Sequence, residues 1–135
     1  MNRKWVRMYV QLIIVLLLTF GASFSLANLI KNITKVPRPC VGLTNCPKDY
    51  SFPSRSVLVA FALTVAFMLE TKNKFLSGVF AIISTVISAE RIITVVHTPI
   101  DVIAGAVIGI ILGFLIQRAY LFLRFYYSET REIKK

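Results

Sequence analysis

Hydrophobic residues lie along this chain in four long runs that are separated by shorter polar stretches. The runs cover residues 8–30, 57–69, 75–89 and 100–116. The first is long enough, at about 1.5 Å per helical residue, to cross a hydrocarbon core of about 30 Å. The second is short, and it reaches that length only if its helix begins near Pro53, since proline suits the first turn of a helix. The pattern predicts helices over residues 8–30, 53–70, 75–96 and 99–127.

The composition indicates a membrane protein. Of the 135 residues, 56% are hydrophobic, and the mean hydropathy is +0.72, well above that of soluble proteins. We predict an all-α fold in which residues 1–135 form one membrane-embedded bundle of about four transmembrane helices, with an outer loop over residues 31–52. The first run follows basic residues and has small residues near Ala27, so it also resembles a cleaved signal peptide. Its continuation through Leu29 and Ile30 favours a retained helix.

Small residues recur at four-residue spacing in two of the runs. One series is Gly105, Gly109 and Gly113, and the other is Ser77, Ala81, Thr85 and Ala89. Stripes of this kind let helix backbones approach one another closely in lipid. We therefore expect both series to be packing faces.

The basic residues divide between the two ends of the predicted helices. Ten of the sixteen lie at one end, namely Arg3, Lys4, Arg7, Lys72, Lys74, Arg118, Arg124, Arg131, Lys134 and Lys135. The positive-inside rule predicts that this end, with both termini, is cytoplasmic in a multi-pass protein of the cell membrane. The other six are Lys31, Lys35, Arg38, Lys48, Arg55 and Arg91. The net charge of +10 does not indicate a nucleic-acid partner, because the cations alternate with apolar spans and form no groove with stacking aromatics.

Four of the outer cations belong to three separate segments that meet at the same end of the bundle. These residues, Lys31, Arg38, Arg55 and Arg91, have the side chains that bind phosphate or diphosphate. The alternative is that they are solvated loop charges attracted to lipid headgroups. Either interpretation makes membrane lipids the partners of this surface.

The only histidine, His97, lies beside these cations. It can act as a nucleophile toward phosphorus if a partner fixes its tautomer, and Asp101, four residues later, is placed to do so. The alternative interpretation is helix capping, with Thr98 as N-cap, Pro99 at the first helical position and Asp101 near the positive end of the dipole. The two interpretations are compatible.

Two cysteines, Cys40 and Cys46, lie in the outer loop. In an oxidising compartment they can form a local disulfide, and the alternative is a pair of free thiols. The sequence does not favour one over the other.

These residues resemble the three-part signature of the type 2 phosphatidic acid phosphatase superfamily, which is related to the vanadium haloperoxidases. Its first part, Lys, six residues and Arg-Pro, is present as Lys31 and Arg38-Pro39. The second, Pro-Ser-Gly-His, is present in altered form as residues 53–56, Pro-Ser-Arg-Ser. The third, Ser-Arg, five residues, His, three residues and Asp, is present as Arg91, His97 and Asp101.

The resemblance implies a minimal four-helix form of that family's membrane fold, with its active site at the outer face. It implies that His97 becomes a phosphohistidine and that Asp101 orients it. The phosphate oxygens would be bound by Lys31, Arg38, Arg91 and the segment Pro53, Ser54 and Arg55. No metal and no cofactor is implied.

Two positions depart from the signature. Ser56 stands where the family has the histidine that serves as general acid, and Glu90 stands where it has the serine before Arg91. A positioned acid typically contributes about 10²–10⁴-fold to a rate. Either the chain is impaired, or its chemistry tolerates the loss. A lipid diphosphate fits the second case, because its leaving group is a phosphate monoester with a second pKa of about 6 and can depart without a proton. A more speculative alternative is that Glu90 supplies the proton.

We therefore predict a membrane lipid phosphatase that converts a polyprenyl diphosphate, of undecaprenyl or dolichyl type, to the monophosphate and inorganic phosphate. One alternative is hydrolysis of phosphatidic acid or a related lipid monophosphate. Another is a noncatalytic binder of anionic lipid headgroups, in keeping with Ser56.

Overall fold

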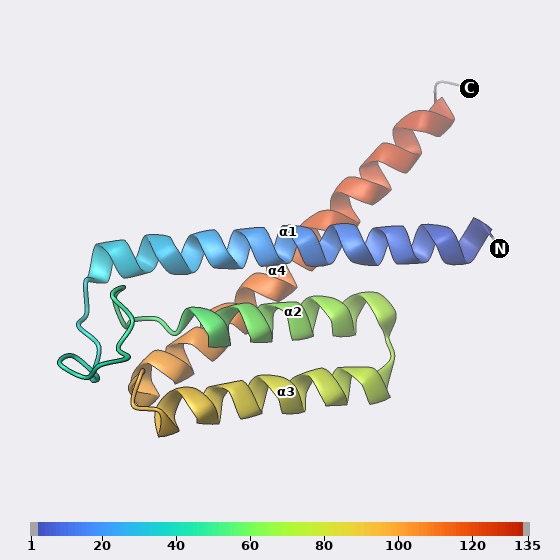
Figure 1. Ribbon diagram of the computed structural model, residues 1–135. Helices are drawn as coiled ribbons and strands as arrows, with labels where there is room; N and C mark the ends of the chain where they lie inside the picture. Colours follow the sequence, from blue (N-terminus) through green and yellow to red (C-terminus); the bar gives the residue numbers. More distant parts are fainter. Residues whose placement is uncertain (1–2, 134–135) are drawn as a thin grey trace.

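A computed structural model describes residues 3–133, with side chains for residues 5–127. It contains helices α1 (Arg3–Thr34), α2 (Arg55–Thr71), α3 (Lys74–Ile93) and α4 (Pro99–Ile133), and no strand within the described residues (Figure 1). The predicted all-α fold is confirmed. Within this part of the chain, α1, α3 and α4 are long and apolar enough to cross a membrane, whereas α2 has 17 residues. The charge count given earlier includes Arg3, Lys4, Arg131, Lys134 and Lys135, which lie outside the residues with described side chains.

The start of α2 differs from the prediction. The helix begins at Arg55, and Pro53 precedes the N-cap residue Ser54, which has an extended backbone (φ −67°, ψ 104°). The backbone N–H of Ser54 donates to the carbonyl oxygen of Asp101 over 3.0 Å. This bond to the first turn of α4 holds the segment before Arg55 outside the helix.

The third helix also ends earlier than predicted, at Ile93 instead of residue 96. Val95 has a φ of +55°, in the left-handed region, and therefore cannot continue a right-handed helix. At the other end of α3, the side chain of Asn73 accepts a hydrogen bond from the Leu76 N–H over 3.1 Å and caps the helix.

Helix α2 is the centre of the bundle, because each of the other three helices packs more extensively against α2 than against any other helix. Its contact with α4 runs along the glycine series. A Cβ added to Gly105 or Gly113 would lie 2.8 Å from the carbonyl oxygen of Ser54 or 2.5 Å from that of Ala62. At Gly109 it would overlap the carbonyl group of Leu58. The prediction that this series is a packing face is confirmed.

The prediction for the other series was wrong. Ser77 is buried, but Ala81, Thr85 and Ala89 are exposed. The second buried residue of α3 is Ser84, whose Oγ lies 2.9 Å from Oγ1 of Thr64 on α2. A helix has 3.6 residues per turn, so positions seven apart return to nearly the same face while a four-residue series drifts away from it.

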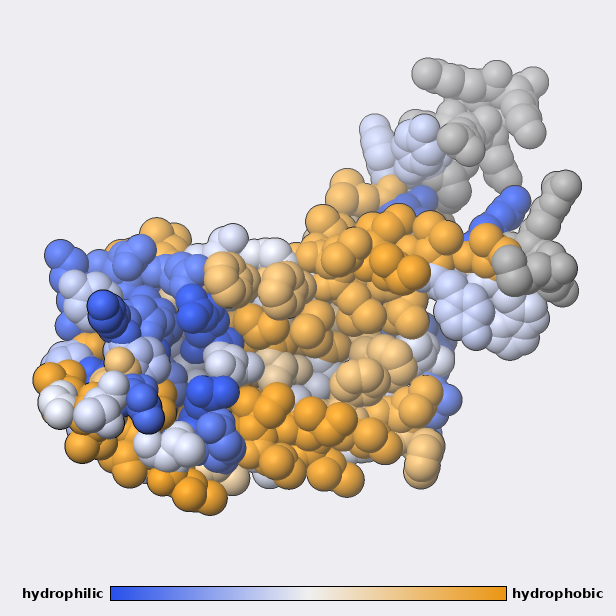
Figure 2. All heavy atoms as spheres, viewed as in Figure 1, coloured by the Kyte–Doolittle hydropathy of each residue, from blue (hydrophilic) through white to orange (hydrophobic). Residues whose placement is uncertain are grey.

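The polar and apolar surfaces of the molecule are separated along the helix axes. Figure 2 shows hydrophobic side chains over the helical body and hydrophilic ones at the end that carries the loop between α1 and α2. Both termini point to the other end of the bundle (Figure 1). The three segments singled out by the sequence motifs therefore meet at the polar end, away from the termini.

Candidate functional site

A small polar cavity of about 110 Å³ lies at this end of the bundle. It is lined by six residues of the predicted site, namely Lys31, Arg38, Arg55, Ser56, Arg91 and His97, together with Pro47, Asp49 and Val96. The end of α1, the loop, the start of α2 and the link from α3 to α4 all contribute. Segments that are far apart in the sequence thus form one cationic cavity.

Hydrogen bonds determine the tautomer of His97. The ring is 5% exposed, and its Nε2 lies 3.0 Å from Nη1 of Arg38. An arginine can only donate, so Nε2 must be the acceptor and the neutral ring must carry its proton on Nδ1. The lone pair on Nε2 is consequently directed toward Arg38, which lines the cavity together with His97.

The opposite nitrogen of the ring faces a serine and a carboxylate. Nδ1 of His97 lies 3.3 Å from Oγ of Ser51 and 3.6 Å from Oδ2 of Asp101. Ser51 donates to that same carboxylate oxygen over 2.5 Å. Ser51 thus accepts from His97 and donates to Asp101, and the three residues form a buried chain of hydrogen bonds.

Asp101 caps its own helix as well. Its Oδ2 accepts from the backbone N–H of Thr98 over 2.8 Å, and its N–H lies 3.3 Å from Oγ1 of Thr98. One carboxylate therefore caps the helix and lies on the Nδ1 side of His97, and its function in orienting the ring stays a prediction. The cap keeps the carboxylate in place behind His97, outside the cavity lining.

Asp49 is the counter-ion of the cavity's cations. Its carboxylate lies 2.6 Å from Nη2 of Arg38, 3.1 Å from Nζ of Lys31 and 3.8 Å from Nη2 of Arg55. Lys31 also donates to the carbonyl oxygen of Tyr50. Arg38 donates to the carbonyl oxygens of Asp49 and Val96 over 2.9 and 3.1 Å. Both cations are almost fully buried and are held in fixed orientations by these contacts.

The electrostatic environment shifts the pKa of two groups in the loops. Burial, followed by the charges of Arg38 and Lys31, lowers the pKa of His97 from 6.5 to about 4. Burial tends to raise the pKa of Asp49, but hydrogen bonds from Arg38 and Lys31 outweigh it and lower that pKa to about 2. At neutral pH His97 is therefore an uncharged base, and Asp49 is an anion.

The remaining predicted residues occupy different positions. Pro53 and Ser54 are fully buried and do not line the cavity. Arg91 lines it, with Nε 2.8 Å from Oε2 of Glu90, whose side chain is 47% exposed and is not part of the lining. Ser56, which stands at the position of the expected acid, lies in the cavity wall, and its side chain has no acidic proton.

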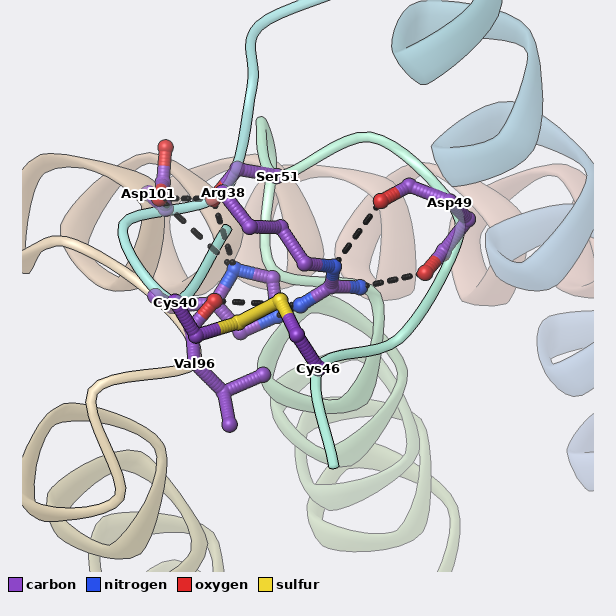
Figure 3. Close-up of a disulfide and its surroundings, with 8 residues drawn as sticks. Arg38, Cys40, Cys46, Asp49, Ser51, Val96 and Asp101 are labelled. Atoms are coloured by element: carbon purple, nitrogen blue, oxygen red, sulfur yellow. Dashed lines mark hydrogen bonds and ion pairs between the residues drawn. A yellow bond between two sulfur atoms is a disulfide. The ribbon is translucent and has the colours of Figure 1, made fainter. Parts of the chain in front are cut away.

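The two cysteines of the loop form a disulfide between Cys40 and Cys46. Figure 3 shows this bond in the loop from which Arg38 extends to Asp49. Cys40 is buried and follows Arg38 by two residues, so the cross-link restrains the segment that carries the guanidinium group. Asp49 follows Cys46 in the same loop.

Comparison with known proteins agrees with the signature. The family model of the PAP2 superfamily matches residues 11–125. The chain belongs to the PAP2 superfamily. It is also 34% identical, over 140 residues, to a protein of Dictyostelium discoideum named a probable sphingosine-1-phosphate phosphatase, a match that covers 90% of this chain and 34% of that relative. The chain thus spans about a third of the relative's length. No solved structure matches it.

Two residues of this PAP2 superfamily site were not predicted from the sequence. Asp49 is one of only three acidic residues on the outer side, and it follows a loop rich in cations. Assigning Asp49 as the counter-ion of the outer cations would have identified it as a residue of the cavity. No comparable signal in the sequence marks Ser51, because its contacts with His97 and Asp101 form only where the loop lies against the first turn of α4.

The structure of this PAP2 superfamily member also bears on metal binding. Within its described residues, no three His, Cys, Asp or Glu side chains gather as a set of metal ligands. The donors of the cavity are guanidinium and ammonium groups, which bind anions directly.

Proposed function

We propose that this protein is a membrane lipid phosphatase in which His97 attacks phosphorus. The observation that supports this most directly is the tautomer of His97, because its basic Nε2 belongs to a cavity wall that also carries four cations. A neutral imidazole beside bound phosphate is the arrangement that nucleophilic catalysis by histidine requires.

In the first step, Lys31, Arg38, Arg55 and Arg91 bind the phosphoryl oxygens, and Arg38 transfers its Nη1 hydrogen bond from His97 to the phosphate. Nε2 then forms a bond to phosphorus as the bond from phosphorus to the leaving oxygen breaks. The positive charge that develops on the ring is stabilised by Asp101, partly through Ser51. In the second step, water cleaves the N–P bond, releases inorganic phosphate and restores neutral His97.

The need of the leaving group for a proton favours a diphosphate as the substrate. Among the described residues that line the cavity, Ser56 occupies the position of the general acid and Asp49 is an anion. Glu90 is outside the lining, so we assign it no proton transfer. A lipid monophosphate can depart from phosphorus without a proton, whereas an alkoxide needs one. A polyprenyl diphosphate of undecaprenyl or dolichyl type has the required leaving group.

A second candidate is a lipid monophosphate of the sphingoid type. It is favoured by the 34% identity to the protein named a probable sphingosine-1-phosphate phosphatase. With this substrate the leaving group is an alcohol, and water would have to supply the proton in place of a side chain. The two candidates differ in how strongly their rates depend on an added acid.

Phosphate release by the purified protein tests the proposal. A prenyl diphosphate and sphingosine 1-phosphate are compared for the unmodified protein, His97→Gln and Ser56→His. We expect release by the unmodified protein, an acid-labile phosphoryl label that is absent from His97→Gln, and a larger gain for the monophosphate than for the diphosphate in Ser56→His. Equal gains for both substrates would contradict the diphosphate preference. Retained lipid binding with no release by any of the three proteins would support a noncatalytic binder.

We also propose that both termini face the cytoplasm and that the cavity faces the outer side of the cell membrane. The charge distribution supports this orientation, because Arg7 lies near the start of α1 and Lys72 and Lys74 lie at the link from α2 to α3, and Figure 1 shows both of these parts at the end opposite to the loop between α1 and α2. A membrane-impermeant maleimide tests it on intact cells. A cysteine replacing Asn73 should stay unlabelled until the cells are opened, and one replacing Thr44 should be labelled at once.

A further inference from the structure

An apolar groove runs along α2 and opens into the phosphate cavity. It consists of two adjoining hollows of about 410 and 320 Å³, which share Phe20, Leu63 and Phe80. The larger hollow also shares Arg55 and Ser56 with the cationic cavity. A continuous path therefore leads from the phosphate-binding residues into the hydrophobic part of the bundle.

The groove exists because α1 and α3 lie on either side of α2 without meeting. No backbone contact joins α1 to α3 among the described residues, whereas each packs on α2 (Figure 1). The small side chains of Ser56, Ala60 and Thr64, spaced by four residues, form the floor of the larger hollow on α2, which Val59 and Leu63 also line. Phe20 and Phe24 of α1 and Phe80, Ile83 and Ile87 of α3 are among the larger side chains that line it.

The opposite side of α2 leaves no such path. Gly105 and Gly109 bring the backbone of α4 against the carbonyl groups of Ser54 and Leu58. Val57 and Leu58 on that side are fully buried. A hydrocarbon chain that leaves the cavity along α2 must therefore follow the side between α1 and α3, which is also where it can enter from the bilayer.

Arg55 marks the boundary between the polar cavity and the apolar groove. Its guanidinium group lies over the ring of Phe24, 4.9 Å from the centroid, and donates to Oδ1 of Asn28 over 2.9 Å. The same group lies 3.8 Å from Asp49 in the cavity. One side chain thus contacts both the ring at the head of the groove and the counter-ion of the phosphate site, as expected where a headgroup joins its tail.

We propose that this groove binds the hydrocarbon tail of the substrate and selects lipid phosphates with a single long chain. The inference rests on the proposed function for the identity of the headgroup. Because the backbone of α4 closes the opposite side of α2, the cavity adjoins one apolar groove among the described residues, and one groove accommodates one chain. From Arg55 to Phe67 the groove follows α2 for about 18 Å, so the tail contributes binding energy along most of the helix.

Blocking the floor tests the groove. Ala60→Trp fills it, and Val107→Trp is the matched control on the exposed face of α4. With a long-chain single-tail phosphate substrate, we expect KM to rise at least about tenfold in Ala60→Trp, since losing the burial of two methylene groups already has that effect. With a short-chain, water-soluble phosphate of the same headgroup, KM and kcat should stay unchanged. Val107→Trp should change neither.

Retained short-chain turnover shows that Ala60→Trp is folded, and Ala60→Leu provides a milder block. Equal KM for the long-chain substrate in Ala60→Trp and the unmodified protein would overturn the groove. Equal loss with both substrates would do so as well. Two-chain lipid phosphates hydrolysed as well as single-chain ones by the unmodified protein would overturn the selectivity.

A second measurement separates this inference from the catalytic proposal. A single-tail alkyl phosphonate with a photoreactive group in mid-chain, which cannot be hydrolysed, is cross-linked to the unmodified protein. We expect labels on peptides containing Phe20 or Phe80, and their loss in Ala60→Trp. This result would support the groove even if no phosphate were released from any lipid. Labels confined to α4 would overturn it.

Discussion

Asp49 accepts two hydrogen bonds from the guanidinium group of Arg38, one at its carboxylate over 2.6 Å and one at its backbone carbonyl oxygen over 2.9 Å. The same carboxylate contacts Lys31. An anion that belongs to the protein therefore lies among the groups that would bind the substrate's phosphate. It has two opposing effects, because it orients the cations and also neutralises part of their charge.

Replacing Asp49 by Asn should separate these effects. Inhibition by inorganic phosphate should become stronger, since the cavity gains one net positive charge, while kcat should fall about tenfold because charge-assisted hydrogen bonds to Lys31 and Arg38 are lost. Steady-state kinetics with phosphate as inhibitor measures both quantities. Asp49→Glu, which retains the charge, should recover most of kcat. Weaker phosphate inhibition in Asp49→Asn would contradict the assignment.

Ser51 should act as a positioning residue for His97. In Ser51→Ala we expect kcat to fall about tenfold, the effect of losing one buried hydrogen bond and leaving its partner less well satisfied. The ¹⁵N shifts of the imidazole should show a smaller fraction of the Nδ1–H tautomer, a change that a purely structural residue would not cause. Ser51→Thr keeps the hydroxyl group and should restore both readouts. An unchanged tautomer in Ser51→Ala would rule out this function.

The low pKa of His97 sets the pH range of activity. The ring stays neutral above about pH 5, since its pKa is about 4, so the acid limb caused by His97 should lie near pH 4 instead of 6.5. Between pH 6.5 and 4 the unfolded chain takes up this proton before the folded protein does, so stability should decrease as the pH falls through that interval. Because His97 is the only histidine, NMR of the tag-free protein reports its titration alone. Arg38→Gln should raise its pKa, and a midpoint near 6.5 in the unmodified protein would contradict the structure.

The disulfide predicts the behaviour of the cysteines toward alkylating reagents. In protein isolated without reductant and then denatured, we expect neither Cys40 nor Cys46 to react, and mass spectrometry after alkylation measures this directly. The double variant Cys40→Ser/Cys46→Ser should be less stable by about 2 kcal/mol, the entropy expected for a short closed loop. Two labelled thiols would show that the bond is absent.

The glycine contact between α4 and α2 should be intolerant of even one methyl group. Gly109→Ala places a Cβ on the carbonyl group of Leu58, so we expect it to lower the melting temperature clearly. Gly21→Ala in α1 is the matched control, because the added Cβ has no atom within 4 Å apart from its own helical backbone and chain neighbours, and alanine favours helix. Equal melting temperatures for the two variants would contradict the close approach of the helices.

Some parts of this structure followed directly from the sequence, and others required the folded chain. The four helices follow from long apolar runs. Residues such as Lys31, Arg38 and His97 were singled out because the positive-inside rule does not account for cations at the outer ends of membrane-spanning helices. The start of α2 was placed two residues early, because nothing local shows that Ser54 is bonded to Asp101 on α4. The prediction that the small-residue series on α3 forms a packing face was wrong for a similar reason, because spacing alone does not show which face of the helix contacts α2.

Partnerships across segments were the hardest to predict. The relation of Asp101 to His97 follows from their separation by four residues, but Ser51 joins that pair only because the loop returns to the first turn of α4. The tail groove depends on the absence of a contact between α1 and α3, which no local pattern encodes.

Helix α2 is shorter than its neighbours. Its 17 residues rise about 26 Å, less than the roughly 30 Å of a hydrocarbon core. Arg55 and Ser56 begin this helix and line the cavity, so on the proposed function the phosphate would bind close to the depth at which lipid headgroups join their chains. A lipid would therefore reach the site by lateral diffusion, without being lifted out of its leaflet. For such an encounter the relevant concentration would be the lipid's mole fraction in the membrane plane, and the proposed reaction would proceed in two dimensions.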